Sequence, residues 1–360
     1  MNQSGPSTVE TRPFALDLAT PLKTARGDIR RREGVLVGVE REGDGEVVRG
    51  VGEATPLPGW TESYEQCREA LEDVSVDGRD ANLECLPAAA HGYQQAALDA
   101  EARGRGVPLA ALLAEESSPD GSRIGDGGRI AAAVPVNATV GDGDAEETVA
   151  AAERARSAGY DCVKLKVGAR ALDTDLERVH AVLDAVDVAV RLDANGAWDR
   201  ETAERAVEAV APLGVEYVEQ PLPAGDLAGL ASLRGRGVDV AVDETLASHS
   251  PRAVLEAGAA DVAVLKPMAL GGPGAAAGLA RHLLSNGVDP VITTTVDGAV
   301  ARAAAVHVAA TVPEVRPCGL ATADLLAEDL VPDPVPVSDG RIAVPSGPGT
   351  CGDAFDDLLW

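Results

Sequence analysis

The sequence predicts an α/β chain: a barrel of parallel strands with outer helices, preceded by a small α+β domain and followed by a short tail. Three observations predict this. Short apolar runs alternate with stretches of helical spacing between about residues 129 and 320. A polar, glycine-rich break, EESSPDGSRIGDGG (115–128), separates this region from the residues before it. After about residue 320 the chain is rich in proline and lacks periodicity.

The first part, residues 1–128, is predicted to be the small α+β domain. Its strands are expected between Thr11 and Glu53, and they are followed by the Pro/Gly loop GEATPLPGW (52–60) and by helices near 62–73 and 91–103. The tail, residues 321–360, is expected to pack back on this domain and complete it.

The barrel is predicted over residues 129–320. Eight apolar runs mark its strands: AAAVPVNATV, CVKLKV, VAVRLDAN, VEYVEQP, VDVAVDET, DVAVLKP, PVITTT and VRPCGL. Most gaps between them hold a helical stretch such as RETAERAVEAVAPLG. Because a strand that follows a crossover helix pairs in parallel, eight such units imply a closed barrel.

The composition excludes several classes of protein. The formal charge is −27, from 31 basic and 58 acidic residues, which argues against binding of nucleic acid and is typical of a halophilic protein that stays dispersed in high salt. The five cysteines are scattered and predict neither disulfides nor a thiolate zinc site. No signal peptide or membrane-spanning run is recognised, so a cytoplasmic protein is expected.

Charged residues end successive predicted strands. The stretch YDCVKLKVG places Lys164 and Lys166, two of only four lysines in the chain, on the same face of one strand. From Lys166 the next strand ends follow at intervals of 27, 26, 24 and 23 residues, at Asp193, Glu219, Asp243 and Lys266. The carboxyl ends of barrel strands meet at one mouth, where barrel enzymes keep their active sites.

This pattern predicts proton-transfer chemistry beside a cation. Three converging carboxylates are suited to a hard divalent cation such as Mg²⁺. Lysines approach from both sides, and a lysine among cations in a low dielectric has a lowered pKa and can take a proton near neutral pH. The alternative for each carboxylate alone is a helix cap or an ion pair. Glu244 is interpreted as a supporting or capping group, and Asn195 either orients a ligand or caps the next helix.

The motifs VKLKVG, RLDANGAWD, VEQPLP, VAVDET and VLKP resemble those of the enolase superfamily, in its muconate-lactonizing subgroup. The resemblance covers nearly the whole chain and implies a modified (β/α)₇β barrel with a capping α+β domain. It also implies roles for the strand-end residues. Asp193, Glu219 and Asp243 become ligands of Mg²⁺ (or Mn²⁺), Lys166 and Lys266 become acid/base groups, and Lys164 tunes Lys166.

Two loops of the first domain resemble those of o-succinylbenzoate synthases. GEATPLPGWTESYE carries Trp60, and LKTARGDIRRREGVLVGV carries a group of arginines at positions 26, 30, 31 and 32. All four are candidates to meet a substrate with two carboxylates, and Arg26 and Arg30 are chosen as the substrate contacts; the alternative is a solvated turn.

Later strands also bear on the substrate. The hydroxyls of Thr293, Thr294 and Thr295 suit a succinyl carboxylate. The run CGLATADL lacks the Asp-x-Asp pair that dipeptide epimerases carry at this position, which argues against a dipeptide.

The resemblance therefore predicts dehydration of 2-succinyl-6-hydroxy-2,4-cyclohexadiene-1-carboxylate to o-succinylbenzoate, in menaquinone biosynthesis. The alternative is an N-acylamino-acid racemase or another epimerase or cycloisomerase of the subgroup. Two further alternatives are a metal-free lyase with a Schiff base on Lys266 and a non-catalytic binding protein. The expected partner is a small carboxylate, with no nucleic acid and no membrane, and a homo-oligomer stays open.

Overall fold

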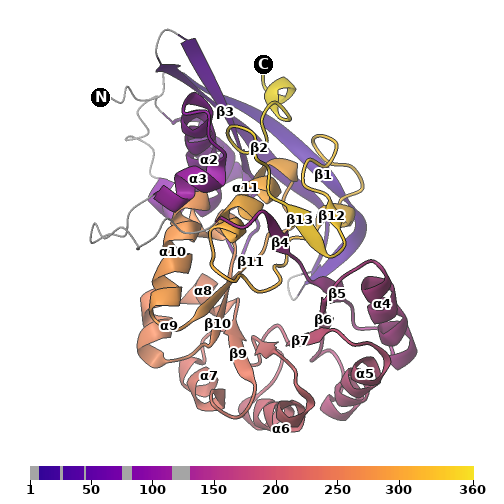
Figure 1. The fold of residues 1–360 in the computed structure, drawn as a ribbon. Coiled ribbons are helices and arrows are strands. Elements are labelled where there is room, and N and C mark those ends of the chain that lie inside the picture. Colours follow the sequence, from indigo (N-terminus) through magenta and orange to yellow (C-terminus); the bar gives the residue numbers. More distant parts are fainter. Residues whose placement is uncertain (1–7, 25–26, 44–45, 75–82, 116–129) are drawn as a thin grey trace.

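The computed structural model describes residues 8–24, 27–43, 46–74, 83–115 and 130–360 (Figure 1). Its amino-terminal part is a three-stranded antiparallel sheet in the order β1 (Thr8–Thr24), β2 (Gly27–Gly43) and β3 (Glu46–Ala54). The helices α1 (Tyr64–Glu72), α2 (Pro87–Gly104) and α3 (Leu109–Glu115) follow it. This part is the capping domain, and it lies against one side of the barrel (Figure 1).

Helix α2 covers the free edge of β3 at very short range. A Cβ atom added at Gly52 would lie 2.0 Å from the carbonyl oxygen of Gly92, so only glycine permits this approach. The edge amide groups are satisfied by α2 side chains, since Val51 N–H donates to Asp99 (3.0 Å). The edge is therefore closed to pairing with another chain.

Seven parallel strands form the curved barrel sheet, in the order β11-β10-β9-β8-β7-β6-β5. They are β5 (Ala138–Val140), β6 (Cys162–Lys166), β7 (Ala189–Asp193), β8 (Tyr217–Glu219), β9 (Asp239–Val242), β10 (Val262–Leu265) and β11 (Asp289–Ile292). The helices between and after them are α4 (Ala145–Ser157), α5 (Leu172–Ala185), α6 (Arg200–Val210), α7 (Leu227–Leu233), α8 (Thr245–Ser248), α9 (Pro251–Ala257), α10 (Pro273–Ser285) and α11 (Ala299–Ala310).

The eighth strand position is held by single bridges. Cys318 pairs in parallel with Val136, and Gly319 pairs in parallel with Thr293 at the end of β11. These two bridges join the last strand to the start of the first and close the ring. The arrangement confirms the predicted (β/α)₇β barrel with a separate capping domain.

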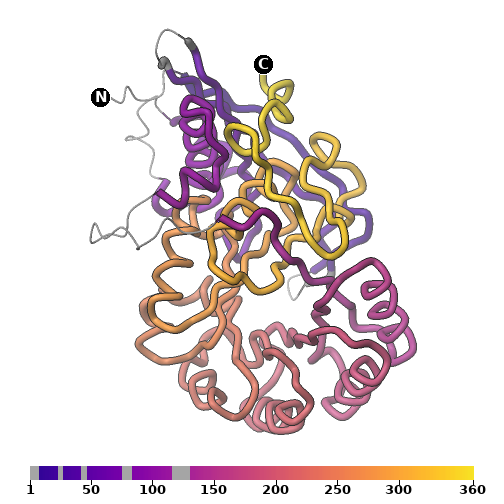
Figure 2. Tube along the Cα trace, viewed as in Figure 1, coloured from indigo at the N-terminus to yellow at the C-terminus, as the bar shows by residue number. Residues whose placement is uncertain are grey.

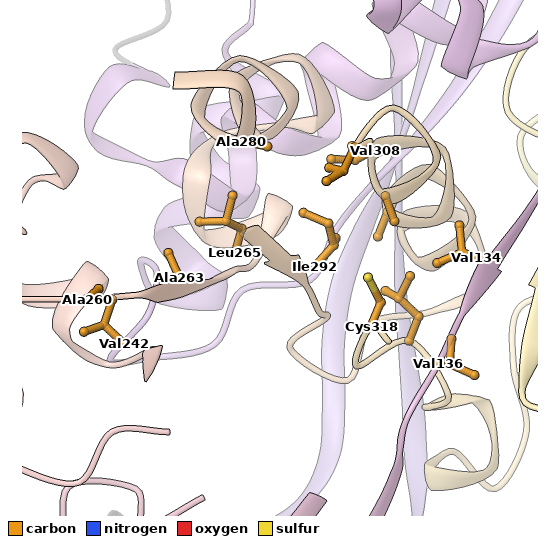
Figure 3. Close-up of a cluster of buried hydrophobic side chains, with 14 of the residues drawn as sticks. Val134, Val136, Val242, Ala260, Ala263, Leu265, Ala280, Ile292, Val308 and Cys318 are labelled. Atoms are coloured by element: carbon orange, nitrogen blue, oxygen red, sulfur yellow. The ribbon is translucent and has the colours of Figure 1, made fainter. Parts of the chain in front are cut away.

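Helix α11 is buried along its whole length. Its sequence AVARAAAVHVAA is apolar on nearly every side, as expected for a helix enclosed by other elements. It packs against β11 and α10 of the barrel and also against β3 of the capping domain. Figure 3 shows part of this core, with Ile292 of β11 near Val308 of α11.

The tail connects the barrel and the capping domain. Strands β12 (Val337–Ser338) and β13 (Arg341–Ala343) form a small sheet with β4 (Ala133–Pro135). The chain then returns to the capping sheet (Figure 2), where the guanidinium of Arg49 lies 5.0 Å from the ring centroid of Trp360.

The predicted domain boundary at 128/129 lies outside the described residues, and the three domain ranges stay predictions. No helix within the described residues is long and apolar enough to cross a membrane.

Candidate active site

Strand register brings the predicted site residues into one row. Lys166 of β6 is the register partner of Asp193 of β7, and Asp193 is the partner of Glu219 of β8. Asp243 follows β9 directly, and Lys266 follows β10. The regular spacing in the sequence thus reflects equivalent positions at the carboxyl ends of five neighbouring strands.

The two lysines of β6 contact the first two carboxylates. The Nζ atom of Lys164 donates to both oxygens of Glu219 (2.9 and 3.1 Å) and lies 3.0 Å from Asp193 Oδ2. Lys166 Nζ donates to the same Asp193 oxygen at 2.7 Å. About a third of the Lys166 side chain is exposed (35%) against 16% for Lys164, so Lys166 is the more accessible of the two β6 lysines.

Lys266 faces the site from the other side. Its Nζ donates to both oxygens of Asp243 (2.5 and 2.6 Å) and lies 3.3 Å from the ring centroid of Trp60, which belongs to the capping domain. A cavity of about 240 Å³ adjoins this pair, with Leu246 and Leu270 on its walls. A capping loop therefore completes the barrel mouth, and its aromatic ring covers a catalytic candidate.

Burial and the neighbouring charges shift the pKa values of this cluster. Burial raises the pKa of Glu219 to about 7, and the negative charge of Asp193 adds to the rise. Burial also raises the pKa of Asp193, but Lys164 and Lys166 more than offset it, and the net pKa is lowered. The pKa of Asp243 is raised by burial, against the opposing effect of Lys266.

The neighbouring carboxylates decide the pKa of Lys164 in this structure. Burial lowers the pKa of its ammonium group, but the carboxylates of Asp193 and Glu219 outweigh burial and hold the pKa well above its ordinary value. The two carboxylates therefore favour the charged form of Lys164. This suits a residue that tunes its neighbour and not one that accepts a proton.

Asn195 and Glu244 extend the cluster. Asn195 Oδ1 accepts from Lys166 Nζ (2.8 Å), and Asn195 Nδ2 donates to Glu244 Oε1 (2.9 Å). The other oxygen, Glu244 Oε2, is buried without a partner among the described residues. Asn195 therefore orients Lys166. Its side chain does not cap the next helix, α6, because Asp199 is the N-cap residue there.

Sequence analysis overlooked Gln220. Its side-chain Oε1 accepts from the backbone N–H groups of Asp243 (3.0 Å) and Thr245 (3.1 Å), and its backbone adopts the left-handed region, with φ of 41°. It therefore fixes the backbone at Asp243 from the adjacent strand end. The only signal in the sequence is its place directly after Glu219, in VEQP.

The hydroxyl groups of the three threonines predicted to contact the substrate all make hydrogen bonds within the protein. The Thr294 hydroxyl shares a hydrogen bond with that of Thr322 (3.1 Å), while the hydroxyl of Thr293 donates to Gly319 O (2.9 Å) and that of Thr295 donates to Asp297. Arg30 is exposed and lies 3.6 Å from Asp28. Arg26 lies outside the described residues.

The donor set fits a hard divalent cation. Asp193, Glu219 and Asp243 are almost fully buried and present only carboxylate oxygens, the ligands that Mg²⁺ prefers. Within the described residues no group of three or more His, Cys, Asp or Glu side chains is arranged to hold a metal ion, and lysine ammonium groups contact the oxygens of all three carboxylates. Cation binding therefore requires the carboxylates to exchange lysine contacts for metal contacts.

Comparison with known proteins defines the class. The family described as "Enolase C-terminal domain-like" matches residues 147–353, and the chain belongs to this family, within the enolase superfamily. The chain is also similar to the o-succinylbenzoate synthase of Thermobifida fusca, with 42% identity over 209 residues. That match covers 56% of this chain and 63% of the relative, so it spans less than two thirds of the relative's length.

Solved structures agree over nearly the full chain. The muconate lactonizing enzyme of Pseudomonas fluorescens, complexed with muconolactone, matches with a TM-score of 0.82 and 26% identity, covering 99% of this chain and 98% of that one. The dipeptide epimerase of Methylococcus capsulatus, complexed with Mg and the dipeptide L-Arg-D-Lys, matches with a TM-score of 0.81 and 27% identity, covering 97% and 99%. The resemblance recognised in the sequence motifs is thereby confirmed.

Proposed function

We propose that this protein is an enzyme that dehydrates 2-succinyl-6-hydroxy-2,4-cyclohexadiene-1-carboxylate to o-succinylbenzoate. One observation carries the proposal: Lys166 and Lys266 flank a row of three buried carboxylates at the barrel mouth. The 42% identity to an o-succinylbenzoate synthase supports this reaction over others of the superfamily. The step belongs to menaquinone synthesis, and a cytoplasmic location is part of the same proposal.

The chain's own residues account for the proton transfers. Neutral Lys166, oriented by Asn195, removes the α-proton beside the ring carboxylate, and the C–H electrons form an enolate. The enolate electrons then expel the 6-hydroxyl group, which takes the proton back from Lys166 and leaves as water. Lys266 stays an ammonium ion and faces the developing negative charge. The ring becomes aromatic, and the net change is loss of one water.

Asp193, Glu219 and Asp243 would hold Mg²⁺, or Mn²⁺ in its place. When bound, the cation supplies positive charge that stabilises the enolate. Gln220 keeps Asp243 aligned with the other two ligands through the backbone at positions 243 and 245.

Racemisation of an N-acylamino acid is the second candidate. Lysines on opposite sides of one site can remove a proton from one face of a carbon atom and return it to the other face, and Lys166 and Lys266 come from opposite ends of the carboxylate row. We favour the dehydration over racemisation because the dehydration needs only one base.

An ultraviolet assay tests the proposal. Purified protein at high KCl with Mg²⁺ is mixed with the cyclohexadiene carboxylate, and loss of the diene absorbance is followed, with EDTA and re-addition of Mg²⁺ as controls. Rapid turnover that EDTA abolishes and Mg²⁺ restores is expected. Absence of turnover in folded, metal-bound protein counts against dehydration, and N-succinyl amino acids in D₂O are then the substrates to try.

A further inference from the structure

Arg32 does not serve as a substrate-facing arginine. It lies on β2, is only 3% exposed, and its guanidinium donates to three backbone carbonyls. These are Thr55 O (2.8 Å), Pro56 O (3.0 Å) and Val296 O (3.2 Å). Because the buried guanidinium already donates to these three carbonyls, the structure assigns Arg32 contacts within the protein that the sequence-based grouping with the substrate arginines did not anticipate.

The three carbonyls belong to two loops, one that carries Trp60 and one that carries the predicted substrate contacts Thr294 and Thr295. Thr55 and Pro56 begin the capping loop that carries Trp60 over Lys266. The same loop contacts the residue two positions after Lys266, since Thr55 N–H donates to the sulfur of Met268 (3.4 Å). Val296 belongs to the barrel loop 293–298, which joins β11 to α11 and carries Thr294 and Thr295.

The barrel loop is strained at Val296. Its φ of 62° is a left-handed conformation that is strongly disfavoured for a β-branched residue. Such a conformation persists only where its surroundings enforce it. Arg32 binds the carbonyl of this residue, and the Thr294 hydroxyl accepts from its N–H (3.3 Å).

Glu53 of β3 holds the far end of the same loop. Its carboxylate accepts from the backbone N–H groups of Gly298 (2.7 Å) and Ala301 (2.9 Å), at the buried start of α11. It thereby caps a barrel helix from the capping domain, where a negative charge is favoured. The adjacent Gln95 donates to Val300 O (2.7 Å), so α2 contacts the same helix start.

We infer that Arg32 and Glu53 are positioning residues for the substrate pocket. They hold the loop of Thr294 and Thr295 at a fixed distance from the loop of Trp60, and so set the width of the barrel mouth. The inference rests on the proposed function in one respect, that substrate binds between these loops. A purely stabilising role for the two residues would leave substrate affinity unchanged.

Hydrogen exchange tests the positioning without a substrate. Arg32→Met is compared with Arg31→Met, the same change at the neighbouring exposed arginine. Amide exchange in both 54–62 and 293–301 is expected to rise at least tenfold in Arg32→Met alone, with β10 unchanged. Protection equal to that of Arg31→Met in these two segments overturns the inference.

Kinetics test the effect on the pocket. In Arg32→Met and Glu53→Gln, KM for the cyclohexadiene carboxylate is expected to rise at least tenfold while kcat stays within threefold. Simple destabilisation instead lowers the active fraction, so kcat falls at constant KM, and that result overturns the inference.

Two other results, a variant that does not fold and a wild-type protein without activity, can be told apart from failure of the inference. Should Arg32→Met not fold, Arg32→Lys replaces it, because lysine keeps the charge and can donate to only some of the three carbonyls. If the wild-type protein does not dehydrate the substrate, the proposed function fails, while the exchange experiment still decides whether Arg32 holds both loops.

Discussion

The ring of Trp60 lies against the ammonium group of Lys266, with 3.3 Å between the ring centroid and Nζ. One residue comes from the capping domain and the other from a barrel strand end. The contact therefore joins the capping domain to the barrel strand end that carries one of the proposed acid/base groups. Several predictions test the consequences of this assembly.

Removing the Trp60 ring is expected to weaken catalysis moderately. A cation–π contact contributes about 0.5–2 kcal/mol, so kcat/KM of Trp60→Leu should fall about tenfold, and Trp60→Phe should lose less. Trp360→Leu is the control, because Trp360 stacks on Arg49 at the tail. Equal effects of the two leucine variants on kcat/KM would show that the Lys266 contact has no role.

Glu219 is expected to be necessary for cation binding. Glu219→Gln should reduce Mg²⁺ affinity in a calorimetric titration by roughly 100-fold, since even residues that only support metal ligands contribute 10–100-fold. Glu216→Gln is a matched control, because Glu216 lies at the opposite end of β8 and pairs with Arg191 (2.6 Å). Mg²⁺ affinity that is the same in both variants would remove Glu219 from the ligand set.

His307 should make stability depend on acid pH. It is buried in α11, where Nδ1 accepts from Ala110 N–H and Nε2 contacts Thr350 O, so the neutral ring is required. Burial lowers its pKa from 6.5 to about 4. The unfolded chain then binds the proton more tightly, and about 3 kcal/mol of stability is lost as the pH falls from 6.5 to 4.

The measurement is the free energy of unfolding in denaturant between pH 4 and 7. His307→Gln should lack only the His307 part of the acid loss, because burial lowers the pKa of His91 to about 4 as well, whereas His180→Gln, at an exposed site on α5, should retain both parts. Ionisation of Glu53 gives the opposite pH dependence of stability. Burial raises the pKa of Glu53 to about 7 in the folded protein, so its contribution to stability is fully present below pH 4.5 and is lost as the pH rises through 7. Parallel pH profiles for the two histidine variants would contradict the assignment.

Salt should stabilise the fold. With a formal charge of −27, the folded chain repels itself, and the Debye length falls from about 10 Å at 0.1 M to about 3 Å at 1 M. Tm is expected to rise by several degrees between 0.1 M and 2 M KCl. A Tm that falls or does not change over this range would contradict the halophilic interpretation of the composition.

The barrel and the site row could be predicted from the sequence because both depend on local periodicity. Strand ends spaced by about 25 residues become neighbours in any parallel barrel, so the sequence alone predicts that Asp193, Glu219 and Asp243 converge. The eighth strand is harder to recognise in the sequence than the other seven. In the structure it is represented only by single bridges at Cys318 and Gly319, which leave little periodicity of apolar residues.

Contacts between distant segments could not be predicted. In the run Arg30–Arg31–Arg32 the composition is uniform, yet Arg32 is buried under two loops while its neighbours are exposed. Whether a strand residue is buried depends on which element covers its face of the sheet, and that element here is a barrel loop more than 260 residues away. The role of Gln220 was hidden for the same reason, because its partners lie on the next strand end.

The assignment of Lys166 as the base is the central claim, and Lys166→Ala tests it most directly. Turnover of the cyclohexadiene carboxylate is measured with Mg²⁺, beside Arg170→Ala, a change in the exposed loop after β6. Loss of the base should reduce kcat by roughly 100-fold or more while the fold and Mg²⁺ binding persist. A Lys166→Ala protein that retains turnover within a few-fold of wild type would contradict the account.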